Sequence, residues 1–155
     1  MYNKANVGYE EARGAVDAMV EEVKKRPDRY WQHCCVMVMD ESSVPVCVAK
    51  LDGSSPHPYY QAYRKAFTSA HWRMHTSEYQ SMISKREWSE QTYGPEYSVC
   101  PGGVAIFPPE YDDDPKGRPV CLGAIGVSAA GEFGADEELA IVGLDYIKKV
   151  LWPSK

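Results

Sequence analysis

Apolar residues recur every three to four positions in several stretches of the chain, which is the spacing of an amphipathic helix. This period predicts helices over residues 8–25, 59–70 and 136–151. Ser77 is a candidate N-cap for a further, shorter helix with Tyr79 and Ile83 on its inner face. Four helices are therefore expected, and Pro27 marks the end of the first.

Shorter stretches rich in Val, Ile, Met and Cys predict strands over residues 33–39, 46–51, 104–107 and 120–127. A short polar link joins the first two strands as a hairpin, and a long acidic loop joins the last two. The order α-β-β-α-α-β-β-α pairs neighbouring strands antiparallel. We therefore expect an α/β (α+β) protein with a central antiparallel sheet and helices packed on its faces, and residues 1–155 as a single domain.

Composition and charge narrow the function classes. A net charge of −5 argues against a general nucleic-acid binder, which needs a basic face. No apolar run approaches the ~18 residues of a membrane span, and the first residues lack the apolar core of a signal peptide. We therefore expect a cytoplasmic protein with neither nucleic acid nor membrane as a partner.

The cysteines are expected to be reduced and structural. Their number, five, is odd, and no CxxC pair suggests a zinc or thioredoxin-type site. Cys35, Cys47, Cys100 and Cys121 have apolar, strand-like neighbours in the sequence. A free cysteine in such surroundings behaves as a small buried hydrophobic residue.

Residues 71–75 contain two histidines, one on each side of an arginine. If the second helix continues, His71 and His75 lie on one face, a geometry that suits a haem ligand, another metal or a general acid/base pair. The alternative is that both are surface histidines at a helix end. Arg73 is either a clamp for a substrate carboxylate or a solvated loop charge.

Glycines mark the starts and interiors of the later strands. Gly102 and Gly103 open one strand, and Gly126 lies within another, so close backbone approach or a bulge is expected there. The loop after that strand leads to a helix N-terminus at Asp136, which can hold an anion such as a carboxylate. Alternatively, Asp136 itself complements this helix end.

Three further features have simple interpretations. Lys65 is expected to pair with a carboxylate, since a lysine nucleophile needs strong desolvation. The run of acidic residues 112–114 is expected to be a solvated turn rather than a cation site. The chain also has eleven tyrosines and four tryptophans, which suit a pocket for a flat or apolar organic ligand as well as core packing. The tyrosines nearest the expected cleft are Tyr59, Tyr60, Tyr93 and Tyr97.

Several of these segments occur together in one order: LDG at 51–53, YRKAFTSA at 63–70, GGVAI at 102–106, GAIGVS at 123–128, and a helix that opens with Asp136 and Glu137. In this order they resemble the GlcG/HbpS-like family, also found as the C-terminal domain of PduO-type proteins, across residues 8–150. The resemblance implies a profilin-like fold that assembles into homodimers or larger homo-oligomers. It also implies haem as a ligand of some members.

Two functions follow, and both place the site in one cleft formed by the loop 52–58, the end of the second helix, the strand entrance 100–103 and the loop 128–136. The first is an enzyme without cofactor or metal, of lyase, isomerase or cyclase type, acting on a small organic ligand by general acid/base catalysis. The alternative is a haem-binding protein with a storage, sensing or redox role. Departures from the family pattern, such as Pro101 in place of a glycine and Ala105 in place of a proline, favour the enzyme.

Each function assigns roles to particular side chains. For the enzyme, the expected catalytic residues are His71, His75 and Glu132, and the expected substrate-binding or supporting residues are Arg73, Tyr97, Gly102, Gly103, Lys65 and Asp136. For the haem protein, the candidate iron ligands are His71, His75 and Cys100.

Overall fold

The computed structural model describes residues 5–89, 94–112, 118–129, 131 and 134–153. Its elements follow the expected order. They are α1 (Tyr9–Lys25), β1 (Cys35–Asp40), β2 (Pro45–Lys50), α2 (His57–Trp72), α3 (Thr76–Lys85), β3 (Gly103–Ile106), a 3₁₀ turn (Pro109–Tyr111), β4 (Gly123–Ser128) and α4 (Ala135–Leu151). The predicted succession of helices and strands is therefore confirmed.

The four strands form one antiparallel sheet in the order β2-β1-β4-β3. β1 and β4 are its two central strands, and β3 and β4 are the strands joined by the long acidic loop. Strands β3 and β4 are buried along their whole length, whereas β2 at the edge is largely accessible. The expected fold class, a mixed α/β protein built on an antiparallel sheet, is confirmed.

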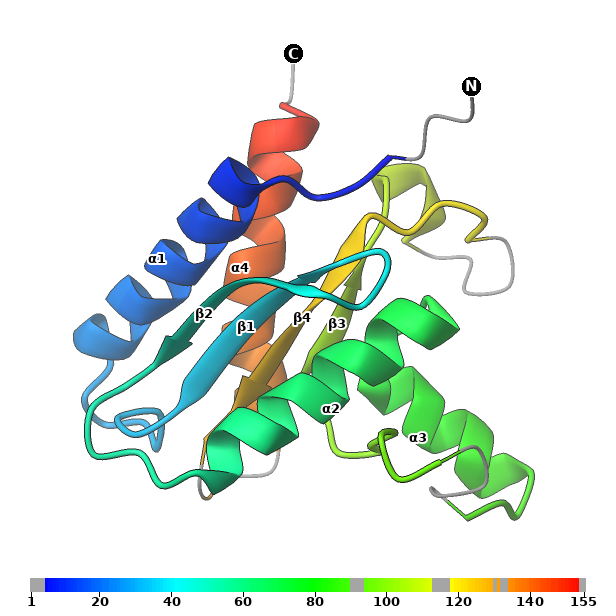
Figure 1. Ribbon diagram of the computed structural model, residues 1–155, viewed down its shortest axis with the longest axis horizontal. Helices are drawn as coiled ribbons and strands as arrows, with labels where there is room; N and C mark the ends of the chain where they lie inside the picture. The colour runs from blue at the N-terminus through cyan, green and yellow to red at the C-terminus, as the bar shows by residue number, and fades with distance from the viewer. Residues whose placement is uncertain (1–4, 90–93, 113–117, 130, 132–133, 154–155) are drawn as a thin grey trace.

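Helices cover both faces of the sheet (Figure 1). α1 and α4 lie side by side on one face, and α2 crosses the other, with α3 next to it. The larger hydrophobic core lies beneath α1 and α4. The α2 face has a thinner core, in which Ala62, Ala66 and Ala70 pack on Met37 and Ala124.

Small residues let α2 approach the sheet very closely. A Cβ atom placed on Gly126 of β4 would lie 2.0 Å from the backbone oxygen of Ala62. No side chain fits into that distance, so only glycine permits this contact. The close backbone approach expected for this strand glycine is confirmed, and it fixes the height of α2 above the sheet.

The connection between α2 and α3 differs from the expectation. α2 ends at Trp72 because Arg73 adopts a left-handed conformation, with φ of 52°. His75, not Ser77, is the N-cap of α3, because the His75 N–H donates to Glu78 Oε2 at 2.7 Å. The expectation that His71 and His75 share one helix face is therefore wrong. In the part of the chain that the structure describes, no helix has the length and apolar character needed to cross a membrane.

Candidate functional site

A cleft of about 540 Å³ opens between the first half of α2, the segment before β3 and the start of α4. The lining residues with the most chemical capacity are His57, Arg64, Lys65, Cys100, Ser128 and Asp136. The strand entrance near residue 100 and the loop that follows residue 128 were both expected in this cleft, and both line it. The end of α2 is not part of its described lining, so that part of the expectation is wrong.

The buried pair of Lys65 and Asp136 lies at one wall of the cleft. The Lys65 ammonium, on a residue only 4% exposed, donates to Asp136 Oδ2 at 2.6 Å and to the Val127 carbonyl at 3.0 Å. Asp136 Oδ1 accepts the Ala129 N–H at 2.9 Å. Burial raises the pKa of Asp136, although Lys65 and the Ala129 N–H act in the opposite direction. Lys65 thus pairs with a carboxylate, as expected, and the pair ties the end of β4 to the start of α4.

A second part of the lining, which includes Ser98 and Cys100, is held by polar groups of α2. Arg64 Nη2 donates to the Tyr97 carbonyl at 2.7 Å, and the Ser98 N–H donates to Thr68 Oγ1 at 2.8 Å. Ser98 Oγ in turn accepts the Cys100 N–H at 3.3 Å. Cys100 is exposed, which corrects the expectation that it is a buried strand residue. Cys100 therefore lines the cleft on a segment anchored to α2.

Gly102 lets the chain pass directly over the ion pair. Its φ is 123°, a conformation that residues with a side chain rarely adopt. A Cβ atom there would lie 2.7 Å from the Asp136 Cβ and 3.0 Å from Lys65 Nζ. The glycine is required both by its conformation and by space, and it brings the segment that carries Cys100 against the Lys65–Asp136 wall.

His71 and Arg73 lie in a different, smaller pocket of about 200 Å³, beside Ser43. His71 Nδ1 lies 3.1 Å from the Phe67 carbonyl and 3.0 Å from Ser43 Oγ. Because a carbonyl only accepts hydrogen bonds, Nδ1 carries the ring proton. Arg73 Nη1 donates to the Pro119 carbonyl at 2.6 Å. These side chains are therefore not grouped with Lys65 and Asp136.

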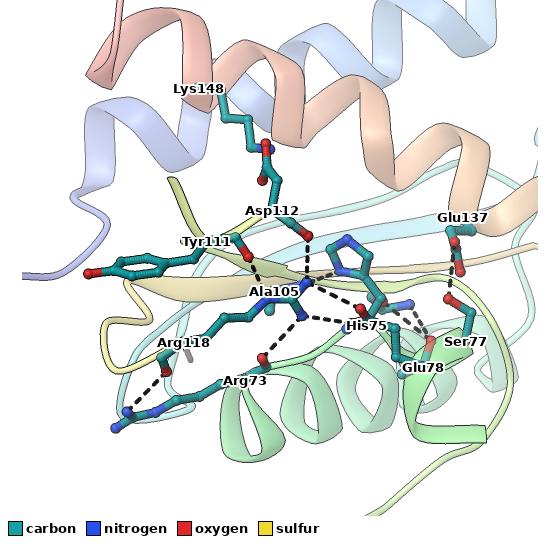
Figure 2. Close-up of polar contacts among 12 residues, drawn as sticks. Arg73, His75, Ser77, Glu78, Ala105, Tyr111, Asp112, Arg118, Glu137 and Lys148 are labelled. Atoms are coloured by element: carbon teal, nitrogen blue, oxygen red, sulfur yellow. Dashed lines mark hydrogen bonds and ion pairs between the residues drawn. The ribbon is translucent and has the colours of Figure 1, made fainter. Parts of the chain in front are cut away.

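His75 belongs to a polar cluster between α3 and the loop that follows β3 (Figure 2). Its Nδ1 accepts the Ala105 N–H at 3.1 Å, so a neutral ring carries its proton on Nε2. Burial lowers the pKa of His75, with a smaller contribution in the same direction from the positive charge of Arg118. The ring packs on Phe107 at 5.8 Å between centroids. His75 is therefore held in place as a neutral acceptor.

Arg118 is the centre of the same cluster. It is 5% exposed, lies over the Phe107 ring at 4.0 Å, and binds both carboxylate oxygens of Glu78 at 2.8 and 3.2 Å. It also donates to the Tyr111 and Asp112 carbonyls, each at 3.0 Å. Burial alone would raise the pKa of Glu78, but the hydrogen bonds from Arg118 and from the His75 N–H outweigh it and lower that pKa. The guanidinium fastens the loop to α3.

Asp112, the described residue of the acidic turn, is exposed, as expected. Its carboxylate also accepts a hydrogen bond from Lys148 of α4 at 2.5 Å, a partner that the sequence did not predict. Asp113 and Asp114 lie outside the described residues, as do Glu132 and Tyr93. The described histidines, cysteines and acidic residues form no group of three that could hold a metal ion.

His57 lies in the segment 52–58 that was expected to form the cleft, although it was not named as a site residue; Gln61 and Arg64, also in the lining, lie outside every segment expected there. With Thr68, these three residues follow one another at intervals of four, three and four along α2, the spacing of one helix face. That polar stripe is visible in the sequence. It was not interpreted as a binding face because a polar helix face is equally typical of a surface in contact with water.

Comparison with known proteins finds relatives over nearly the whole chain. Residues 7–145 match the model of a family described as haem degrading protein, HbpS-like. A double mutant of HbpS from Streptomyces reticuli is 26% identical, with a TM-score of 0.77, 94% of this chain covered and 89% of that one. No curated protein sequence gives a significant match.

Two further structures show the same fold at lower identity. Klebsiella pneumoniae protein ORFY is 17% identical, with a TM-score of 0.78, 96% of this chain covered and 94% of that one. A structure described as a PduOC:heme complex is 15% identical, with a TM-score of 0.73, 92% of this chain covered and 95% of that one.

Proposed function

We propose, from the premise that this chain belongs to the HbpS-like family, that it binds haem in the cleft between α2 and the start of α4. The observation that carries this proposal is the presence of His57 and Cys100 on the same cleft. An imidazole and a thiolate are two of the side chains that most often bind haem iron. A relative of the same fold is described as a complex with heme.

The size and the charge of the cleft also support this ligand. Its volume of about 540 Å³ lies in the range of sites for small molecules and cofactors. Arg64 places positive charge beside it, which suits a group that carries carboxylates. Bound haem would supply a redox-active iron. The residues of this chain would hold and orient it.

The ligand assignment differs from the one based on the sequence. Of the three candidate ligands named there, Cys100 lines this cleft, whereas His71 and His75 are not among its described lining residues. His75 Nδ1 already accepts a backbone N–H, which leaves the proton on Nε2, the nitrogen that would bind iron. We therefore propose His57 and Cys100 as the candidates to test first.

An enzyme without cofactor is the second candidate function. It required His71, His75 and Glu132 to line the cleft, but His71 and His75 lie in two separate polar clusters.

We also retain the proposal of a homodimer or larger homo-oligomer, supported by the exposure of Tyr30 and Tyr60, 64% and 63%. Light scattering that gives the mass of one chain at working concentration would contradict it.

Titration with haemin tests the function. We expect a saturable Soret shift with the wild-type protein, and weaker binding with an altered Soret position in Cys100→Ser. His57→Ala should also weaken binding. The matched controls are Cys47→Ser, on the edge strand β2, and His33→Ala, an exposed histidine outside the described lining of the cleft. Absence of a saturable shift in the wild type would rule out the proposed function.

A further inference from the structure

Arg64 is a cation at the cleft that the described residues leave largely unsatisfied. A guanidinium has five N–H donors, and among the described residues only the Tyr97 carbonyl accepts one of them, at 2.7 Å. The Nε atom is buried and has no hydrogen-bond partner in the described part of the chain. No ion pair joins Arg64 to a described carboxylate.

The two most buried cations of the described chain differ in this respect. Lys65, next along α2, donates to Asp136 at 2.6 Å and to the Val127 carbonyl. Arg118 binds Glu78 through two nitrogens and three backbone carbonyls as well. In both, the charge is balanced within the protein. Arg64 alone among these three lacks an acidic partner in the described residues, and it lines the cleft.

The composition of the cleft indicates which chemical group of a ligand would accept the remaining hydrogen bonds of Arg64. Its lining offers amide and hydroxyl groups from Gln61, Gln80 and Ser98, and its one described carboxylate, Asp136, is already paired with Lys65. A group that brings negative charge and accepts hydrogen bonds in one plane matches the donors of a guanidinium. A carboxylate has these properties.

We propose that Arg64 is a ligand-binding residue that takes a carboxylate of the bound molecule. The inference rests on the proposed function: for haem, the carboxylate is one of the two propionates. The Tyr97 contact would keep the guanidinium in place and leave its other donors for the ligand.

Two ligands and two variants test this inference. Wild-type protein is titrated with haemin and with haemin dimethyl ester, whose propionates are esterified, in the same low concentration of detergent. We expect the diester to bind about tenfold more weakly, the loss typical of a charged hydrogen bond at a partly solvated site. Arg64→Gln should bind haemin about tenfold more weakly than the wild type does. It should bind the diester with the same affinity as the wild type. The Soret position at saturation should not change, because the iron ligands remain.

The controls separate this role from others. Arg13→Gln removes one positive charge from an exposed position on α1, across the sheet from α2, and should bind haemin as the wild type does. Equal affinity of the wild type for haemin and diester would overturn the inference and leave the haem function intact. So would an Arg64→Gln loss of equal size for both ligands, since Arg64 would then act by positioning residues 97–100. If the wild type binds no haemin, the proposed function fails, and this inference fails with it.

Discussion

Lys65 Nζ and Asp136 Oδ2 lie 2.6 Å apart, although 71 positions of sequence separate the two residues. Their side chains are 5% and 15% exposed. The pair joins the middle of α2 to the first turn of α4 and closes one wall of the cleft. Breaking it would leave a charge in a site from which water is largely excluded.

Removal of one partner should therefore be costly. We expect Lys65→Met to lower the free energy of unfolding by about 3 kcal/mol, because the buried Asp136 carboxylate loses its counterion. Urea denaturation measures this. Lys65→Met combined with Asp136→Asn should lose less than the two single changes together. The control is Lys24→Met, which breaks the exposed pair with Glu21 and should leave the free energy of unfolding nearly unchanged. A similar cost for the two lysine variants would contradict the prediction.

The contact between Gly126 and Ala62 predicts a steric effect. Gly126→Ala would place a Cβ atom 2.0 Å from the Ala62 oxygen, so α2 must move off the sheet. We expect a loss of about 3 kcal/mol or failure to fold. Gly134→Ala is the comparison, since Gly134 has φ of 85° but a Cβ atom placed there would meet no described atom within 4 Å beyond its chain neighbours. Backbone strain alone should cost about 1 kcal/mol there. Equal thermal stability of the two variants would show that α2 is not held by this contact.

Arg118 should not be replaceable by lysine. Its guanidinium binds Glu78 by two nitrogens and also reaches the Tyr111 and Asp112 carbonyls, which one ammonium cannot reproduce. We expect Arg118→Lys to lose about 2 kcal/mol and Arg118→Met about 3 kcal/mol or more in denaturant unfolding. Arg86→Lys, at the exposed end of α3, is the control and should be nearly neutral. A neutral Arg118→Lys would show that charge alone matters at this position.

His75 predicts a dependence of stability on pH. Burial lowers its pKa below the ordinary 6.5, so at mildly acidic pH the unfolded chain binds a proton that the folded chain does not. Stability should therefore fall as pH decreases below about 6.5. His75→Asn retains a good N-cap residue and should flatten this part of the curve of unfolding free energy against pH. His33→Asn, at an exposed position, is the control. An unchanged slope in His75→Asn would contradict the prediction.

Glu78 acts in a lower pH range. Its folded pKa is below the ordinary 4.5, so the stability that it contributes is complete above pH 4.5 and is lost as pH falls further. Glu78→Gln should remove the loss of unfolding free energy below pH 4.5, and it should also lower the stability at neutral pH. This variant separates the two groups, because His75 accounts for the loss that begins at higher pH.

Local patterns were sufficient for the fold. The apolar period of α1 and the valine-rich strands predicted the order of elements, because burial of one helix stripe or one strand is a property of adjacent residues. The start of α3 was harder to predict: Glu78 is the third residue after the cap at His75, the spacing of a capping box, but the sequence signature of that box begins with serine or threonine rather than histidine. Ser77 was predicted instead because serine is the more frequent cap.

The candidate site was harder to predict because it depends on tertiary contacts between residues far apart in the sequence. Lys65 was expected to find a carboxylate, but the cleft that the pair borders arises from tertiary packing. The assignment of His71 and His75 to one face failed at a single residue, Arg73, whose left-handed conformation ends α2. The role of Cys100 was misjudged since its neighbours are apolar, whereas its exposure is set by the hydrogen bonds of Arg64 and Thr68 to the preceding backbone.

The contact of Ala62 with Gly126 has a consequence for kinetics. Because α2 is seated on β4 by backbone packing, and both Asp136 and the backbone of residues 97 and 98 are bonded to α2, the positions of these parts of the cleft are set when the chain folds. A ligand then meets a preorganised site and loses little affinity to rearrangement of the protein. Its observed association rate should rise linearly with ligand concentration, without the plateau that a slow opening step would impose.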